Sequence, residues 1–485
     1  MLDNGKPTSL AVLKKCRKFP TVKLSFFSEF KNFVVSETGK KSFFKDITVR
    51  FSVGQLQESP VCCFFKMFLY QTMVYVTLDK RSFKNWNSMW LSEAIYRTTA
   101  LLKLERPIMN FNDKPDRSWS KAYKWQRYKG TDILPMWIAD TEFRCAEPIL
   151  KALHQRVEEG IFGYTLPDHD TDAIEAVVAW CQRQYNWKID PSWLVWTPGV
   201  VPAFNVAIKA YCQAGDTIIV QTPSYPPILA APAINKLNRI CVETVAVDGR
   251  WTLDFDALED AAADPKTSLF IMCNPMNPLG TVLNQHELDR IATICRKHNV
   301  MLCSDEIHCD LILDNVPHLP AGAHPALAEY SVTLMAASKT FNVAGLGTSF
   351  AIIPNEKLRL AFNHAARGIL PWVTATGLAA TNAAFRYCDE WHQQELAYLK
   401  DNRDYLVSEI NKIEGLKAFS PAATFLMWVD ASGLRVNDTQ AWCEAKGVGP
   451  SAGRDFGDKD FFRLNFGCAR EYLVEAIKRL QGRKN

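Results

Sequence analysis

The chain has 485 residues, of which 48% are hydrophobic and 22% are charged, so it is too apolar to be disordered and long enough to bury more than one core. Its 56 Lys and Arg against 52 Asp and Glu leave a formal charge of +4, an excess too small to indicate a nucleic-acid-binding protein or one held on an anionic surface. The 14 cysteines contain no C-x-x-C pair and no grouping with histidine at zinc-ligand spacing, so neither a metal site nor a redox dithiol is predicted.

Residues 1–107 differ in charge from the rest of the chain. They hold 18 Lys and Arg against 8 Asp and Glu, whereas residues 108–485 hold 38 against 44. The most apolar early stretch, 61–76, contains Lys66 and Gln71 and is too short to predict a membrane span. Because no secretion signal precedes it and the cysteines are scattered, we expect no membrane association and a cytoplasmic protein.

From about residue 108, short apolar runs alternate with longer amphipathic stretches, which is typical of βα units around a mostly parallel sheet. Ligands of such sheets bind beyond the carboxyl ends of the strands. No G-x-G-x-x-G follows a strand, and no P-loop or H-E-x-x-H motif occurs, which excludes the usual dinucleotide, P-loop and zinc-protease sites. The strands are predicted at 217–221, 268–273, 300–303, 332–336 and 348–353.

Residues 196–203 predict a strand, a tight turn and a helix with Pro202 in its first turn. Exposed amides and the positive end of the helix dipole would make this helix N-terminus a phosphate site, although an ordinary strand-to-helix turn has the same pattern. The clearest helix is predicted at 284–298, because Asn284 and Glu287 form a capping-box pattern before an apolar face.

Two proline-rich turns follow predicted strands. Tyr225 lies in TPSYPP and would lay its ring against a planar cofactor, and Asn277 lies in NPMNPLG and would donate to an aromatic oxygen. Each is a weak signal alone, because such turns are usually only turns.

Three charged residues lie in or directly after apolar strands, where a buried charge is costly unless it has a partner. Lys339 directly follows one, and a desolvated lysine with a lowered pKa suits Schiff-base chemistry because only the neutral amine attacks a carbonyl. Asp305 ends another, and if the protein bound pyridoxal phosphate, such a carboxylate would pair with the protonated pyridine nitrogen. Arg463 lies inside a third and would bind a substrate carboxylate. The alternatives are a surface lysine, a helix cap or structural ion pair for the aspartate, and an internal carboxylate partner for the arginine.

Taken in order, these motifs resemble one family, the MalY/PatB type of pyridoxal phosphate-dependent cystathionine β-lyase within the class I and II aminotransferase superfamily of fold type I. The similarity runs from about residue 108 to 480 and includes LPMWIAD at 134–140 and FGYT at 162–165. The six motifs that carry it are GVVPA at 199–203, TPSYPP at 222–227, NPMNPLG at 274–280, SDEIH at 304–308, SKTFNVAGL at 338–346 and FRLNFG at 462–467.

The resemblance implies an α/β fold whose mostly parallel central sheet is flanked by helices. A large cofactor-binding domain is expected at 150–390 and a smaller α+β domain at 391–485, which residues 108–149 join. Residues 1–107 lie outside the match, and Met109 stands where members of the family begin. We therefore expect translation to start near Met109 and the upstream segment to be a mis-annotated, poorly packed extension.

The resemblance also implies residue roles. Lys339 forms the Schiff base with the cofactor, Asp305 pairs with the pyridine nitrogen and Tyr225 stacks on the ring, which makes these three the catalytic residues. Asn277 binds the ring hydroxyl with His308 close behind. The remaining implied residues are Ser338 and the amides of Val200 and Val201 at the cofactor, Tyr164 at the phosphate of the neighbouring subunit's site, and Arg463 and Ala139 at the substrate.

A site shared between chains implies a homodimer, and the implied reaction splits cystathionine or a related S-substituted cysteine into pyruvate, ammonia and a thiol such as homocysteine, as in methionine biosynthesis. The sequence departs from the family at 141–144, at 451–457 and at Ala469, so Arg144 or Arg454 would be able to bind a second substrate carboxylate. Two alternatives stay open. One is an aminotransferase that uses the same lysine and aspartate, and the other is a regulatory protein that binds a transcription factor, although residues 1–107 show no helix-turn-helix spacing.

Overall fold

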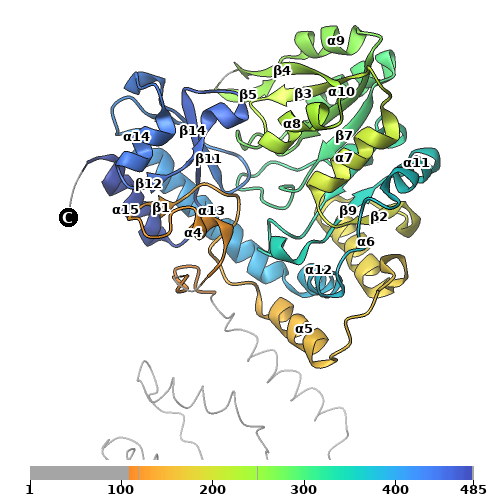
Figure 1. Ribbon diagram of the computed structural model, residues 1–485, viewed down its shortest axis with the longest axis horizontal. Coiled ribbons are helices and arrows are strands. Elements are labelled where there is room, and N and C mark those ends of the chain that lie inside the picture. The colour runs from red at the N-terminus through yellow and green to blue at the C-terminus, as the bar shows by residue number, and fades with distance from the viewer. Residues whose placement is uncertain (1–108, 118–119, 248, 483–485) are drawn as a thin grey trace, which may run out of the picture. The chain divides into compact units, whose positions relative to one another are not determined.

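The structure is a computed structural model that describes residues 109–117, 120–247 and 249–482. The prediction that residues 1–107 pack poorly lies outside these residues. The described residues belong to one compact unit, whose elements Figure 1 shows. In the described part of the chain, no helix combines the length and the apolar character that a membrane crossing requires.

An eight-stranded sheet forms the centre of this unit, and it contains all five predicted strands. The inner strands pair in parallel, as predicted from the βα pattern. The strands, in sheet order, are β2 (Leu194–Thr197), β9 (Ser349–Ile352), β8 (Ser331–Met335), β7 (Met301–Asp305), β6 (Thr267–Cys273), β3 (Thr217–Thr222), β4 (Asn238–Val247) and β5 (Arg250–Leu253).

The sheet is mostly parallel, as predicted, and β9 is an exception within it. It pairs antiparallel with both β8 and β2. The connection from β8 to β9 holds only the short 3-10 helix η6 (Ala344–Leu346) in place of a crossover helix, so the chain turns back instead of crossing over. Because two antiparallel pairings restore the direction, β2 runs the same way as β8, and the two strands end at the same edge of the sheet.

Helices cover both faces of the sheet. Alternate residues of β6 point to opposite faces, as the twofold period of a strand requires. Leu269 and Ile271 join a core with α7 (Val200–Tyr211), α8 (Pro226–Ile234) and α11 (Glu356–Ala366). Phe270 and Met272 join a second core with α9 (Phe255–Ala263) and α10 (Gln285–His298).

The predicted helix at 284–298 is confirmed as α10, together with its cap. The Asn284 side chain accepts from the Glu287 amide at 3.0 Å, and a Glu287 carboxylate oxygen accepts from the Asn284 amide at 2.7 Å. This reciprocal pair satisfies two amides that the first turn leaves without helical partners.

The C-terminal part of the chain builds a second, antiparallel sheet of four strands. Its order is β10 (Lys417–Ala418), β11 (Leu426–Asp430), β14 (Phe461–Asn465) and β13 (Ser451–Ala452). The helices in this part of the chain are α13 (Asp389–Ile410), α14 (Thr439–Ala445) and α15 (Arg470–Leu480).

The earliest described segment lies among these C-terminal elements. Strand β1 (Leu134–Pro135) pairs in parallel with β12 (Val448–Gly449). Figure 1 shows β1 and the short helix α4 (Tyr123–Gln126) beside α13, α15 and β12. After β1 the chain passes along β14, where the Asn465 amide donates to the Met136 carbonyl at 2.9 Å. The N-terminal residues thus reach the edge of the large sheet together with the C-terminal strands.

The helices α5 (Glu147–Glu158), α6 (Thr171–Tyr185) and α12 (Ala375–Tyr387) complete the described fold. Helix α12 packs against both α5 and α6. Trp180 of α6 and Phe385 of α12 stack with ring centroids 4.7 Å apart.

Candidate active site

The predicted site residues gather where β7, β8 and β2 end. Asp305 is the last residue of β7, Lys339 follows β8 by four positions, and α7 begins three positions after β2. Arg463 reaches this edge from β14, and the segment after β1 supplies Ala139. Five elements far apart in the sequence therefore meet at one place.

Lys339 projects its amine onto the segment that follows β1. Its Nζ donates to the Ala139 carbonyl at 2.8 Å and lies 3.8 Å from a carboxylate oxygen of Asp140. Burial lowers the pKa of the Lys339 amine below its usual value; Asp140 opposes this change and Arg463 adds to it. The surface-lysine alternative is therefore wrong, because this amine lies among charged groups at a sheet edge and is more easily neutral than a solvated lysine.

Asp305 is a buried carboxyl group. Its side chain accepts from the Ile307 amide at 3.2 Å, and within the described residues it forms no ion pair. Burial raises its pKa to about 7, and the Lys339 amine acts in the opposite direction. Such a carboxyl group would be stabilised in its charged form by a cation placed directly against it.

His308 lies in the loop that follows Asp305, and it is also buried. Its Nδ1 atom has no hydrogen-bond partner. Burial lowers the pKa of the imidazole to about 3, with further lowering by the positive charges of Lys339 and Arg463. The ring is therefore neutral at physiological pH.

Arg463 is buried on β14, and its guanidinium is bound by neutral groups. Nη1 donates to Asn277 Oδ1 at 2.8 Å, and Nη2 donates to the Trp137 carbonyl at 2.7 Å and to Ser451 Oγ at 3.2 Å. Its Nε has no partner. Burial lowers its pKa to about 10, and the nearby Tyr225 raises it. Among the described residues no carboxylate pairs with it, so the alternative of an internal acidic partner is wrong.

Tyr225 immediately precedes α8 and is half-buried near Arg463 and Asp305. Burial raises the pKa of its hydroxyl, and the charge of Arg463 lowers it. The preceding hydroxyl, Ser224 Oγ, is buried and has no partner. The turn therefore places the Tyr225 ring and the unpaired Ser224 hydroxyl at the same sheet edge.

The N-terminus of α7 has the features predicted for an anion site. The helix begins at Val200, after Gly199, which has no side chain to cap it. The first intrahelical bond goes from the Ala203 amide to the Gly199 carbonyl, and Pro202 has no N–H. The amides of Val200 and Val201 are thus not used within the helix. Ser338, next to Lys339, is half-buried.

Tyr164 does not join the site of its own chain. Its side chain is 95% exposed, and its ring lies edge-to-face with Trp372 at 5.4 Å. The role predicted for it in a neighbouring subunit stays a prediction.

The structure does not support either arginine that was suggested for a second substrate carboxylate. Arg454 pairs with Asp438 at 2.9 Å and also donates to Gln440 at 2.9 Å. Arg144 is exposed and lines a cavity of about 280 Å³ together with Glu147.

Three of the groups that hold the two site cations were not predicted from the sequence, although Ala139 itself was expected at the substrate. These are the backbone carbonyls of Trp137 and Ala139 and the hydroxyl of Ser451, which itself donates to the Trp137 carbonyl at 2.7 Å. The motif LPMWIAD marked the segment but not its carbonyls, because a backbone acceptor leaves no trace in residue type.

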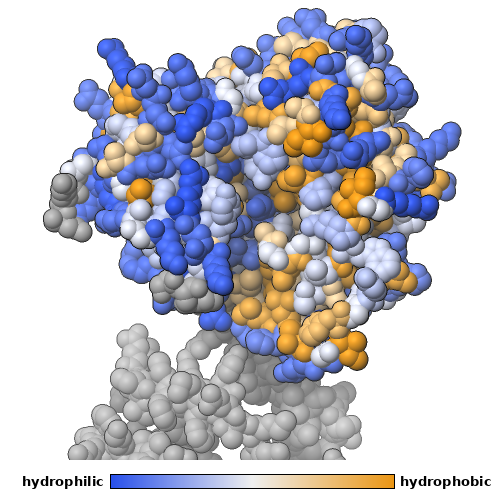
Figure 2. All heavy atoms as spheres, in the orientation of Figure 1, coloured by the Kyte–Doolittle hydropathy of each residue, from blue (hydrophilic) through white to orange (hydrophobic). Residues whose placement is uncertain are grey.

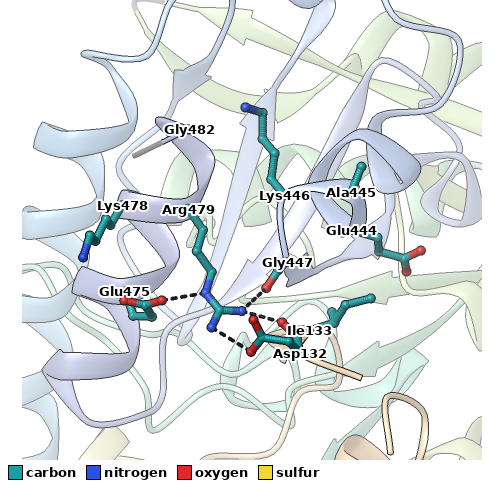
Figure 3. A pocket seen from close by; sticks show the side chains of 10 residues that line it. All are labelled: Asp132, Ile133, Glu444, Ala445, Lys446, Gly447, Glu475, Lys478, Arg479 and Gly482. Carbon is teal, nitrogen blue, oxygen red and sulfur yellow. Dashed lines mark hydrogen bonds and ion pairs between the residues drawn. The ribbon is translucent and has the colours of Figure 1, made fainter. Parts of the chain in front are cut away.

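A larger cavity, of about 660 Å³, lies between α14, α15 and the residues before β1 (Figure 3). Its central cation, Arg479, points at Glu475 and at carbonyl and carboxylate oxygens of Asp132, with a further bond to the Gly447 carbonyl at 2.9 Å. This cavity shares no residue with the sheet edge, and its main cation is already satisfied by these partners.

A family model, curated relatives and solved structures all match most of this chain. Residues 139–480 match the model of the family described as aminotransferase class I and II. The cystathionine beta-lyase PatB of Bacillus subtilis (strain 168) is 34% identical over 388 residues, which cover 77% of this chain and 99% of PatB. The crystal structure of OvoB superposes with a TM-score of 0.75 at 42% identity, over 77% of this chain and 98% of OvoB. A PLP-bound C–S lyase from Staphylococcus hominis has a TM-score of 0.72 at 29% identity, over 77% of this chain and 97% of that lyase.

Proposed function

The chain belongs to the class I and II aminotransferase family, and we propose that it is a pyridoxal phosphate-dependent carbon–sulfur β-lyase that cleaves cystathionine or a related S-substituted cysteine. The observation that carries the proposal is the half-buried Lys339 amine, which has a lowered pKa and shares one sheet edge with the buried Asp305 and Arg463. The names of PatB and of the Staphylococcus hominis lyase support the type of reaction.

The residues at the edge fit pyridoxal phosphate. The α7 N-terminus would bind the phosphate through the amides of Val200 and Val201, with Ser338 beside it. Asp305, a buried carboxyl group that lacks a cation among the described residues, would pair with the protonated ring nitrogen. Tyr225 would lie against the ring.

Two further side chains and the catalytic lysine complete this binding set. Asn277 would donate to the ring hydroxyl oxygen, and the neutral His308 would lie close behind it. Lys339 would hold the cofactor covalently through its amine. When bound, pyridoxal phosphate supplies an electron sink that stabilises negative charge at the substrate Cα.

Arg463 would bind the substrate α-carboxylate. Its guanidinium is held in place by Asn277 and by the Trp137 carbonyl, and no carboxylate of the described residues competes for it. A bidentate guanidinium–carboxylate contact fixes both position and orientation. Ala139, whose carbonyl accepts from Lys339, would border the substrate on the other side.

Lys339 Nζ would then act as the base at the substrate Cα. Its lowered pKa increases the fraction of neutral amine, which alone accepts a proton. With the proton removed from Cα, the Cβ–S bond breaks and the thiolate leaves. For cystathionine the overall reaction consumes one water and yields homocysteine, pyruvate and ammonia, which balances all atoms.

A homodimer with a shared site belongs to the same proposal. Figure 2 shows hydrophobic side chains gathered at the bottom of the view, over α5 and α12. The adjoining segments expose Ile161, Phe162, Tyr164, Ile369 and Trp372, and exposed apolar groups of this kind favour burial against another chain. Tyr164 would reach the cofactor phosphate in the partner's site.

The domain division and the location are proposed on similar grounds. The large sheet draws all its strands from 194–352, and the four-stranded sheet from 417–465, which supports domains at 150–390 and 391–485 with residues 108–149 joining the smaller one. All cysteines of the described residues are free, which supports a cytoplasmic enzyme.

The test is to load the purified protein with pyridoxal phosphate, add cystathionine without any keto acid, and assay pyruvate and free thiol together. Equal amounts of both establish the β-lyase, because transamination releases neither product. Turnover that appears only when a keto acid acceptor is added would contradict the lyase and favour an aminotransferase.

A further inference from the structure

Residues 137–140, here called the acceptor segment, contact both site cations through backbone carbonyls. The Ala139 carbonyl accepts from Lys339 Nζ at 2.8 Å, and the Trp137 carbonyl accepts from Arg463 Nη2 at 2.7 Å. The position of these two carbonyls therefore sets where the two cations lie. Any group that fixes the acceptor segment therefore also affects the positions of Lys339 and Arg463.

The intervening carbonyls of the same segment are both bound by the side chain of Asn465, and the Asp140 carbonyl also accepts from Lys124 Nζ at 3.1 Å. Asn465 Nδ2 donates to the Ile138 carbonyl at 2.6 Å and to the Asp140 carbonyl at 2.7 Å. Successive carbonyls thus alternate between the site cations and Asn465. The Asp140 amide also donates to the Ile138 carbonyl at 2.9 Å, which makes a tight turn around Ala139.

Asn465 is itself held rigidly. It is 1% exposed, its Oδ1 accepts from the Gly467 amide at 2.7 Å, and its backbone amide donates to the Met136 carbonyl at 2.9 Å. All the polar atoms of its side chain are therefore engaged, two donors on the acceptor segment and one acceptor on its own strand end.

We propose that Asn465 is a positioning residue, which sets Lys339 and Arg463 by holding the acceptor segment from behind. The inference rests on the proposed function for its kinetic consequence, but not for its geometry. Arg463 has further partners in Asn277 and Ser451, whereas the Lys339 amine has the Ala139 carbonyl as its close neutral acceptor. Loss of the Asn465 amide therefore affects Lys339 more strongly than Arg463.

The expected change has a definite sign. A carbonyl oxygen that accepts from Nζ stabilises the protonated amine, so Lys339 loses part of this stabilisation when Ala139 is no longer fixed. The pKa of Lys339 then falls further, and the freed amine is less well placed at the substrate Cα. We expect kcat/KM to drop about tenfold in Asn465→Ala, the effect of one weakened hydrogen bond to a charged group.

The chain offers a matched control in Asn402 of α13. This asparagine is also fully buried, and its Nδ2 also donates to two carbonyls two residues apart, those of Phe466 at 3.0 Å and Cys468 at 2.9 Å. Those carbonyls contact neither site cation. Asn402→Ala should therefore lose comparable stability and leave the chemistry of Lys339 unchanged.

The experiment measures the rate at which the apoprotein bonds pyridoxal phosphate, as a function of pH, from the visible absorbance. Only the neutral Lys339 amine reacts, so the profile reports its pKa without any turnover. In Asn465→Ala the profile should shift to lower pH, together with the drop in kcat/KM, and Asn402→Ala should keep the wild-type values. If Asn465→Ala does not fold, Asn465→Ser, whose hydroxyl donates to only one carbonyl, should show a smaller shift of the same sign.

The outcomes separate this inference from the proposed function. A wild-type protein that never bonds the cofactor contradicts both. If the wild-type protein bonds the cofactor and the Asn465 variants have the same pH profile and the same kcat/KM, the positioning role alone is overturned. Equal shifts in the Asn465 and Asn402 variants would also overturn it, because the effect would then follow from lost stability.

Discussion

Asp305→Asn tests the electrostatics of the site through stability, independently of any reaction. Burial raises the pKa of the folded-state carboxyl group from its ordinary 3.8 to about 7. Between these values the folded protein holds a proton that the unfolded chain has released, so unfolding releases a proton and stability falls as pH rises. At 1.36 kcal/mol per pKa unit, the apoprotein loses about 4 kcal/mol across this window.

The amide that Asp305→Asn introduces cannot ionise, and its side-chain oxygen keeps the acceptor for the Ile307 amide. We therefore expect the apo variant to resemble the wild type near pH 4 and to exceed it by about 4 kcal/mol above pH 7, the full size of the same shift. Urea unfolding followed by circular dichroism at several pH values measures the difference. Asp254→Asn, at a partly exposed helix N-cap, controls for the loss of one negative charge. A wild-type protein that is more stable than Asp305→Asn at pH 8 would refute the assignment of a desolvated, unpaired carboxyl group.

The remaining predictions concern activity. Lys339→Ala should lower the β-elimination rate by about 10²–10⁴-fold, the usual contribution of a general base, as measured by pyruvate release; retained activity would contradict its role. Arg463→Lys should raise KM for the amino acid about tenfold or more with a smaller change in kcat, because an ammonium cannot make the bidentate carboxylate contact; an unchanged KM would place the carboxylate elsewhere. Tyr164→Ala should weaken cofactor binding, and refolding it as a mixture with Lys339→Ala should restore about a quarter of the wild-type activity through mixed dimers with one intact site. No restored activity would contradict a site shared between chains.

Much of the fold follows from local pattern. The five strands were predictable because each is an apolar run bounded by turn residues, and α10 because its capping box satisfies its first amides. The direction of β9 was not, because direction depends on what connects two strands, and the loop that carries Lys339 contains no helix long enough to cross over. Lys339 lies in this same loop, directly after the carboxyl end of β8. The connection that reverses the chain direction is therefore also the segment that carries the candidate catalytic lysine.

The candidate site was predictable where chemistry requires a particular side chain. A lysine, an aspartate and an arginine at apolar strands each need an explanation, and together they indicate one cofactor. The acceptor segment was not predictable, because the carbonyls of Trp137 and Ala139 would be present whatever side chains stood there. Asn465 lay within the motif FRLNFG, but only the spatial neighbours of its amide give it a role.

The most direct test of the central claim is to identify the residue that binds the cofactor. The protein is loaded with pyridoxal phosphate, reduced with borohydride to make the bond permanent, digested and mapped by peptide mass spectrometry. We predict a single modified peptide with the pyridoxyl group on Lys339. Modification of another lysine, or none at full cofactor loading, would contradict the assignment of this sheet edge as the catalytic centre.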